Sequence, residues 1–160
     1  MIDRNARFFA RVLLVGAGLS AMAFANPAKA GQCPADQARA DARKPVTTPA
    51  SGVTDTVLAA IDLSKEPAKI ESRNLRLRRL VIQPDGVVPW HSHGDRPAII
   101  YIVDGEVTEY ASTCAVPIVH KAGEVARETS ATSHWWKNTG GRTAVLLSAD
   151  VQHDETDHNM

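Results

Sequence analysis

The part of the chain after residue 56 holds no segment with sustained helical periodicity, and this feature constrains the fold most. Short runs rich in apolar and β-branched residues recur there instead, at 57–63, 74–83 and 98–103 and within 116–128 and 133–151. Turn signals separate them, at Pro84–Gly86, Asp104–Gly105, Ala122–Gly123 and Thr139–Gly141. The Asp-Gly pair among these is typical of a β-hairpin. Short strands at this spacing predict an all-β barrel or sandwich in a single domain.

The run NLRLRRLVIQ alternates apolar and basic residues. Leu75 and Leu77 are predicted to face the interior, and Arg76 and Arg78 to face solvent. Because the apolar residues that follow continue on the opposite parity, a β-bulge is expected at Arg79.

Residues 1–30 are predicted to be a secretory signal peptide. Three arginines precede an uncharged apolar run at 12–25, and a small-x-small cleavage site follows at Ala28–Ala30. An uncleaved membrane anchor is the alternative, but spanning a bilayer takes roughly 20 apolar residues. Cleavage near Ala30 would export the protein to the periplasm or the medium, without membrane attachment.

The mature chain is expected to have three parts. Residues 31–55 are predicted to form a poorly ordered N-terminal arm, residues 56–151 the barrel, and residues 152–160 a mobile tail. The first 30 residues contain four basic residues and one acidic residue, so the mature chain keeps 14 of 18 basic and 17 of 18 acidic residues, a net charge of −3. This balance gives no indication of binding to nucleic acid or to an anionic membrane surface.

Cys33 and Cys114 are the two cysteines of the sequence. In an exported protein two cysteines most simply pair, and this disulfide would tie the arm to the barrel. Two free thiols, or a reactive Cys114 near the site, are the alternatives, because the sequence does not show that the two residues meet.

Two histidines one residue apart, His91 and His93, precede the apolar run at 98–103. Side chains two positions apart on a strand point to the same face, so these imidazoles are candidates for one metal site. His134 lies in a second glycine-led segment, and Asn138, four residues later, is expected to brace a turn.

The stretch PDGVVPWHSHGDRPAIIYIVDG resembles the first motif of the cupin superfamily: a glycine, His-x-His, an acidic residue and a closing glycine. GEVARETSATSHWWKN is similar to the second motif, in which a histidine and an asparagine follow a glycine at fixed spacing. The resemblance implies an all-β double-stranded β-helix, or jelly-roll cupin barrel, with a metal in its mouth. His91, His93 and His134 match the histidine ligands, which suit a divalent transition metal such as Fe, Mn, Zn, Cu or Ni.

The chain departs from the family pattern at one ligand. The family's glutamate, about five residues after the second histidine, is Ala98 here, and Thr129 and Ala131 replace the proline and glycine of the second motif. Three readings of Ala98 stay open: a three-histidine metal centre, a site in which Asp95 supplies the carboxylate, and a barrel that has lost its metal. Asp95 also fits a turn, where aspartate caps backbone N–H groups.

Five further residues are candidates for the wall of a substrate pocket: Trp90, Arg96, Tyr101, Trp135 and Trp136. Arg96 is expected either to bind a substrate carboxylate or to lie on the surface as a partner of Asp95. Strand alternation turns one of Trp135 and Trp136 toward the pocket and the other outward. Tyr101 is expected in the core or in the pocket.

Two kinds of function remain in view. The first is an exported metal-dependent enzyme, an oxygenase or isomerase of a small organic molecule, although the sequence names no general base. The second is a non-catalytic cell-envelope module that binds a metal or small ligand, or a metal-free structural barrel. His120 is predicted to be an ordinary strand histidine, since it has no partner at metal spacing. The family resemblance also implies a homodimer formed through sheet edges.

Overall fold

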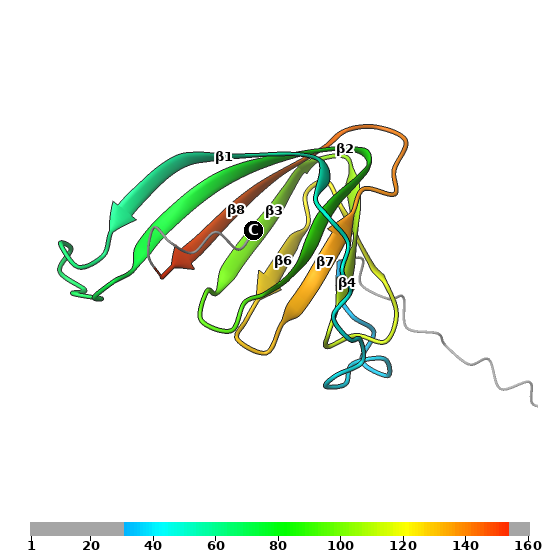
Figure 1. Ribbon diagram of the computed structural model, residues 1–160, viewed down its shortest axis with the longest axis horizontal. Helices are drawn as coiled ribbons and strands as arrows, with labels where there is room; N and C mark the ends of the chain where they lie inside the picture. Colours follow the sequence, from blue (N-terminus) through cyan, green and yellow to red (C-terminus); the bar gives the residue numbers. More distant parts are fainter. Residues whose placement is uncertain (1–30, 154–160) are drawn as a thin grey trace, which may run out of the picture.

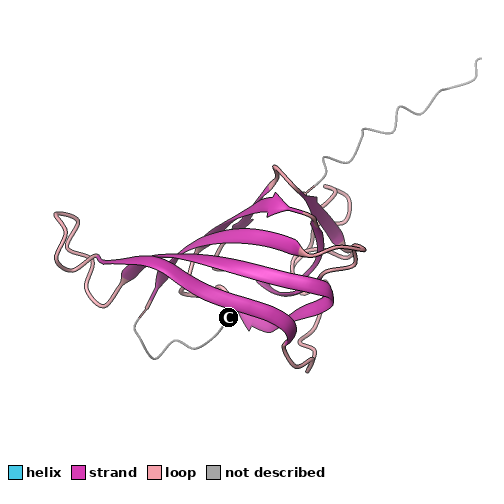
Figure 2. Cartoon of the chain, turned by 90° about the horizontal axis from the view of Figure 1, so that it is seen from above, coloured by secondary structure: helices cyan, strands magenta, loops and turns pink. Residues whose placement is uncertain are grey.

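The computed structural model describes residues 31–153, and in this range it contains eight strands and no helix (Figures 1 and 2). The strands are β1 (Ser51–Asp62), β2 (Asn74–Ser92), β3 (Ala98–Asp104), β4 (Glu106–Ala111), β5 (Ile118–Lys121), β6 (Val125–Glu128), β7 (Ser133–Lys137) and β8 (Ala144–Gln152). The predicted signal peptide and most of the predicted C-terminal tail lie outside the described residues. Within that range, no helix meets the length and apolarity needed to cross a bilayer.

The strands pair antiparallel in one sheet, in the order β5-β4-β7-β2-β8-β3-β6, and β1 pairs with β2. The two ends of this path, β5 and β6, are consecutive in the chain and are joined by the turn at 122–124. That turn is held at the β3–β4 junction by hydrogen bonds from Ala122 N to Gly105 O (3.0 Å) and from Gly123 N to Ile102 O (2.8 Å). The sheet therefore rolls into a nearly closed barrel, which confirms the predicted double-stranded β-helix.

The hydrophobic core fills the middle of the barrel. Its side chains come from alternate positions of six strands, as the period of two in a strand requires. The buried members of the cluster are Leu80, Ile82, Val88, Ile100, Ile102, Val107, Ala126, Trp136, Ala144 and Leu146. Polar and ionisable side chains occupy the interior on either side of this layer.

The prediction for the basic segment of β2 was wrong. Arg76 and Arg78 are buried, whereas Leu75 and Leu77 are exposed at 42% and 36%. The inward parity continues without a shift through this part of the β2–β8 pairing, so there is no bulge at Arg79.

The buried arginines are held by Asp150 on β8. Arg76 donates to both of its carboxylate oxygens at 3.0 and 2.8 Å, and Arg78 Nη2 lies 3.2 Å from Oδ2. Arg78 Nη1 also pairs with Asp55 of β1. Buried charges paired in this way satisfy each other inside the barrel, where leucine was expected.

Two turn predictions also changed. The Asp104–Gly105 turn is present, but β3 and β4 do not pair with each other, so it is not a hairpin. Gly105 has φ +78°, and a Cβ there would lie 2.8 Å from Ala144 Cα, so this crossing requires glycine. The predicted turn at 84–86 lies within β2. Before it β2 pairs with β8, up to Ile82, and after it β2 pairs with β7, from Val87.

Asn138 braces this region, as predicted. Its Nδ2 donates to the carbonyl oxygens of Ile82 and Arg142, both at 2.8 Å, and its Oδ1 accepts from Gly140 N at 2.9 Å.

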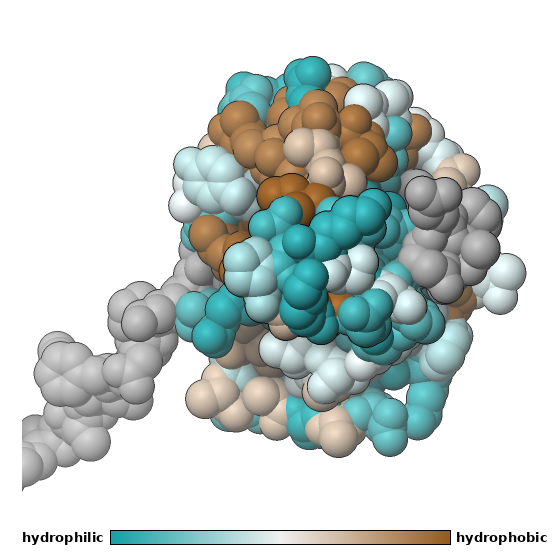
Figure 3. All heavy atoms as spheres, turned by 90° about the vertical axis from the view of Figure 1, so that its left-hand side faces the viewer, coloured by the Kyte–Doolittle hydropathy of each residue, from teal (hydrophilic) through white to brown (hydrophobic). Residues whose placement is uncertain are grey.

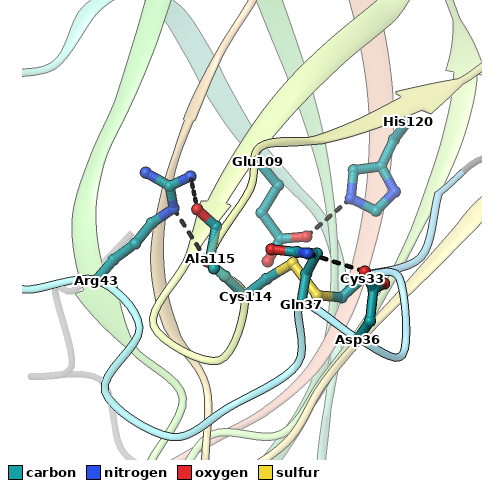
Figure 4. The surroundings of a disulfide bond; sticks show 8 residues. All are labelled: Cys33, Asp36, Gln37, Arg43, Glu109, Cys114, Ala115 and His120. Carbon is teal, nitrogen blue, oxygen red and sulfur yellow. Dashed lines mark hydrogen bonds and ion pairs between the residues drawn. A yellow bond between two sulfur atoms is a disulfide. The ribbon is translucent and has the colours of Figure 1, made fainter.

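The N-terminal arm is attached to the barrel over residues 31–50, beside β4 and β7 (Figure 1). The predicted disulfide between Cys33 and Cys114 is present, with a Cα–Cα distance of 5.8 Å (Figure 4). Arg39 N and Ala42 N donate to backbone oxygens of the 112–113 turn at 3.1 and 2.8 Å. The first strand begins at Ser51, six residues before the predicted start at Val57.

A hydrophobic patch lies on the outer surface of the sheet. Figure 3 shows apolar side chains gathered in the upper part of one face of the molecule. The exposed large apolar residues on β1 and β2 are Val57, Leu58, Ile61, Leu75 and Leu77. A contiguous apolar surface of this kind is typical of a contact site.

Candidate metal centre

Three imidazoles meet inside the barrel. His91 of β2 lies opposite His134 of β7 in the strand register, and His93 follows directly after β2. The three Nε2 atoms lie 3.1 Å (His91 to His93), 3.0 Å (His93 to His134) and 3.1 Å (His134 to His91) apart. His93 and His134 are buried, and His91 is half-buried. The structure thus brings together the three histidines that the sequence singled out.

Each of these rings points its Nδ1 atom at an oxygen. The partner is a backbone carbonyl oxygen for His91 and His93, at 2.9 and 2.8 Å, and Glu109 Oε1 for His134, at 2.7 Å. Carbonyl and carboxylate oxygens only accept hydrogen bonds, so each Nδ1 carries the hydrogen and donates it. In the neutral ring each Nε2 then keeps a lone pair, and the three Nε2 atoms converge on one point.

Two of these rings have a pKa below the ordinary value for histidine. Burial, followed by repulsion from the neighbouring His134, lowers the pKa of His91 to about 2 and that of His93 to about 4. These imidazoles are accordingly neutral near pH 7, which is the form that binds a metal.

The spacing of the triad suits a metal ion. Metal–nitrogen bonds of about 2.0–2.1 Å, at tetrahedral or octahedral angles, put neighbouring nitrogens about 2.9–3.4 Å apart. A cavity of about 20 Å³ adjoins the three rings, which is room for one water-sized ligand. Arg78 and Ser148 also line it, and within residues 31–153 Arg78 Nε and Ser148 Oγ have no hydrogen-bond partner.

Glu109 on β4 is the main site residue that the sequence did not reveal. Its Oε1 accepts from His134, and its Oε2 accepts from His120 Nε2 at 2.8 Å. Burial opposes its ionised form, but the hydrogen bonds from His120 and His134 lower the pKa of Glu109 to about 2. The carboxylate therefore fixes the orientation and tautomer of His134. Strand alternation was the one sequence signal for Glu109, because it lies two residues after Val107 and so on the same inward face of β4.

The position of the missing family ligand is surrounded by other carboxylates. Ala98, 5% exposed, is paired across the sheet with Glu128 of β6 and with Asp150 of β8, both buried. Directly opposed residues share one face of a sheet, so both acids point inward beside the alanine. Burial, followed by the charge of Glu109, raises the pKa of Glu128 to about 9.

The Cupin domain family model matches residues 78–150, which carry both histidine motifs and the strands around them. The chain belongs to the cupin superfamily. No curated protein sequence matches it.

Two solved structures with TM-scores of 0.50 and 0.51 show the same fold. The cupin domain of Cnp3 from Schizosaccharomyces pombe aligns with a TM-score of 0.50 and 14% identity, covering 64% of this chain and 66% of that one. An uncharacterized conserved protein with a double-stranded β-helix domain from Klebsiella pneumoniae gives 0.51 and 14%, covering 69% and 84%. Oxalate oxidase gives 0.48 and 21%, covering 65% and 52%. This cupin thus spans between half and two thirds of the lengths of the Cnp3 and oxalate oxidase chains.

Asp95 of this cupin is not placed with the histidines. Its side chain is 62% exposed, and its Oδ2 lies 3.5 Å from Arg73 and 3.6 Å from His153. The structure therefore gives no support to Asp95 as the substitute carboxylate. Arg96 is 1% exposed, with Nη1 4.0 Å from Asp150 Oδ2, so the expectation of a surface arginine paired with Asp95 was wrong.

The aromatic residues divide as strand alternation predicts. Trp136 is buried and lines the small cavity beside the triad, while Trp135 stacks on Tyr110 at 4.0 Å on the other side of β7. The Trp136 indole N–H lies 2.9 and 3.3 Å from the two nitrogens of His134, with the rings at 89°, so it meets the face of that imidazole. Trp90 is half-buried. Tyr101 is 44% exposed on the outer face of β3, so its assignment to the core or the pocket was wrong.

A second group of ligand atoms shares His134. Glu109, Glu128 and the Nδ1 side of His134 lie close enough together to surround an ion. His134 Nδ1 donates a hydrogen to Glu109, however, and has no lone pair for a metal in that state. The three Nε2 atoms are therefore the better donor set.

Proposed function

We propose that this cupin binds one divalent transition metal ion through Nε2 of His91, His93 and His134. The observation that carries the proposal is the hydrogen bonding of the triad, in which all three Nδ1 atoms donate to oxygens and all three Nε2 lone pairs converge. Glu109 is a positioning residue, because it holds His134 without contacting the metal. Neutral imidazoles suit Fe, Mn, Zn, Cu or Ni.

The chemistry we propose is that of a metal-dependent oxygenase or isomerase acting on a small organic molecule. A bound metal would supply a Lewis acid or a redox centre with open coordination positions. Beside it, the Arg78 Nε–H and the Ser148 hydroxyl are placed to hydrogen-bond a water-sized ligand in the adjoining cavity. His91 is half-buried, whereas the other two histidines are buried, so the triad is accessible to solvent from the His91 side.

One observation favours a second candidate, a non-catalytic metal-binding module. The cavity beside the triad measures about 20 Å³, which does not admit an organic substrate. The two candidates differ in turnover and agree on the metal. An oxygenase would consume dioxygen in the presence of its substrate, whereas a module would bind the metal and turn nothing over.

The test of the metal proposal is elemental analysis of the mature protein, purified without chelators or a histidine tag. About one transition metal ion per chain is expected in the wild type and less than one tenth in His91→Ala/His93→Ala. The matched control is His153→Ala, which removes a half-exposed histidine outside the triad. Equal metal content in all three proteins, or none in the wild type after reconstitution, would refute the proposal.

We further propose that the protein is exported after cleavage near Ala30. The disulfide Cys33–Cys114 supports this, since disulfides persist in oxidising compartments. N-terminal sequencing of the mature protein should begin at Gly31. A chain that retains residues 1–30 would contradict cleavage.

The outer surface supports a homodimer as a further proposal. β1 lies off the main strand path, and Val57, Leu58 and Ile61 on it are 54%, 51% and 48% exposed. An exposed apolar strand of this kind is suited to pairing with a second copy. Size-exclusion chromatography with light scattering should give twice the chain mass, and Leu58→Lys should give the monomer mass.

A further inference from the structure

A larger cavity lies on the other side of His134, between the N-terminal arm and β4 to β6. Its volume is about 290 Å³, close to the lower limit of about 300 Å³ for small-molecule sites. The polar or arm residues in its lining include Cys33, Glu109, Thr113, His120, Glu128 and Thr132. The three metal-ligand candidates are not among the residues that line it. The cavity is thus a site of its own.

His120 presents an unsatisfied nitrogen in this cavity. The residue is 1% exposed, its Nε2 donates to Glu109, and its ring stacks on Trp136 with centroids 4.9 Å apart. Within residues 31–153, its Nδ1 has no hydrogen-bond partner. Because Nε2 carries the hydrogen, Nδ1 of the neutral ring is an acceptor, and leaving such a group buried and unpaired is unfavourable.

The arm passes close to this nitrogen at Gly31. A Cβ placed on Gly31 would lie 3.3 Å from His120 Nδ1 and 3.0 Å from Glu124 Oε2. Glycine, at φ +78°, therefore keeps the chain close to the cavity without filling the space next to the acceptor. The disulfide holds the arm in this position, as Figure 4 shows for Cys33, Glu109 and His120.

Acceptor oxygens line the cavity. Glu109 is ionised between two histidine donors and supplies the negative charge. Glu128, 3% exposed and protonated near pH 7, has its Oε2 3.5 Å from His134 Nδ1, beyond a normal hydrogen bond, and its carbonyl oxygen is a further acceptor. The one guanidinium among the lining residues belongs to Arg127, whose side chain is on the solvent-facing parity of β6. The interior therefore offers acceptors and negative charge.

We propose that this cavity binds a small organic ammonium ion, which donates hydrogen bonds to His120 Nδ1 and Glu128. The ion's charge matches the Glu109 carboxylate, and its N–H groups match the acceptor that the protein leaves unpaired on His120. A carboxylate ligand of the same size meets like charge and offers no donor to His120.

The test is a titration of the ¹⁵N-labelled, disulfide-intact mature protein, without added metal, followed by amide NMR. The probe is ethylammonium chloride, and sodium acetate is the comparison. Ethylammonium should give saturable shifts at Cys33, Thr113 and Thr132, and acetate should give none there. His120→Phe keeps the stacking on Trp136 and should lower the affinity for ethylammonium about fivefold, the effect of one lost hydrogen bond.

His153→Phe is the matched control, since it changes a histidine outside the cavity, and it should bind the probe like the wild type. If His120→Phe does not fold, Glu128→Ala takes its place and should also weaken binding, because it removes the second acceptor. Absence of saturable shifts, acetate binding as tightly as ethylammonium, or unchanged affinity in the variant would overturn the proposal. Because no metal is present, these outcomes are independent of the metal centre.

Discussion

The two nitrogens of His134 face two different regions of the barrel interior. On the Nε2 side, neutral imidazoles, apolar walls and a cavity of about 20 Å³ surround the point where three lone pairs meet. On the Nδ1 side lie Glu109, Glu128 and a cavity of about 290 Å³ bordered by the arm. The proton of His134 assigns the two sides their roles. Because it lies on Nδ1, that nitrogen donates to Glu109, and the lone pair on Nε2 faces the other two histidines.

The two regions suit different ligands. The triad is built from neutral donors within metal-bond reach of one point, so it suits a transition metal. The carboxylate side offers charge and acceptors over a larger volume, so it suits an organic cation. The predictions below separate the two sides.

The largest effect is expected from the disulfide, which belongs to the carboxylate side. Cys33→Ala/Cys114→Ala should lower the free energy of unfolding by about 2–5 kcal/mol, measured by urea denaturation, because the crosslink constrains the unfolded chain. Metal content should remain at the wild-type level, since the triad lies on β2, the residue beyond it and β7. Loss of the metal in this variant would mean that the two sides are not separable.

Glu109→Gln should weaken metal binding about 10–100-fold. The amide has a single acceptor oxygen and cannot accept from His134 and His120 at separate oxygens, as the carboxylate does. Competition with a chromophoric chelator measures the dissociation constant. Glu128→Gln is the matched control, at 3.5 Å from the same nitrogen, and should change the affinity less than about threefold. Equal effects of the two substitutions would assign no special role to Glu109.

The raised pKa of Glu128 predicts a pH-dependent stability of the metal-free protein. Its carboxyl stays protonated in the fold up to about pH 9 but ionises in the unfolded chain above about 4.5, so this contribution to stability is lost as pH rises. Between pH 7 and pH 9, Tm should fall by about 5 °C more in the wild type than in Glu128→Gln. Parallel curves would show that Glu128 has an ordinary pKa.

The smallest effect is expected from Asp95→Asn. Its exposed carboxylate faces Arg73 and His153, so metal affinity should stay within about twofold of the wild type. A tenfold loss would make Asp95 a ligand and return the centre to a three-histidine, one-carboxylate set.

The sequence predicted the parts of this molecule that local pattern controls. Turn residues and short apolar runs indicated the all-β fold, the His-x-His spacing put two rings on one face, and the cupin motifs added His134. Arg76 and Arg78 were misplaced because solvent exposure is the usual fate of arginine in an alternating strand. Their burial depends on Asp150, a partner more than 70 residues away that no local pattern announces.

Glu109 was missed, and His120 was predicted to be an ordinary strand histidine, for a related reason. Each occupies an inward position on a strand that reads as ordinary, and their roles follow from the β4–β5 and β4–β7 pairings. Tyr101 was misplaced because the parity of β3 is set by Ala98, which starts the strand facing inward. Pairing across the barrel, rather than local sequence, decides these positions.

The most direct test of the metal centre is a crystal structure of the metal-loaded protein with anomalous diffraction data collected at the absorption edge of the metal. We expect one strong peak within bonding distance of Nε2 of His91, His93 and His134, with Glu109 still hydrogen-bonded to His134 Nδ1. A peak between Glu109, Glu128 and His134 Nδ1, with none at the triad, would contradict it.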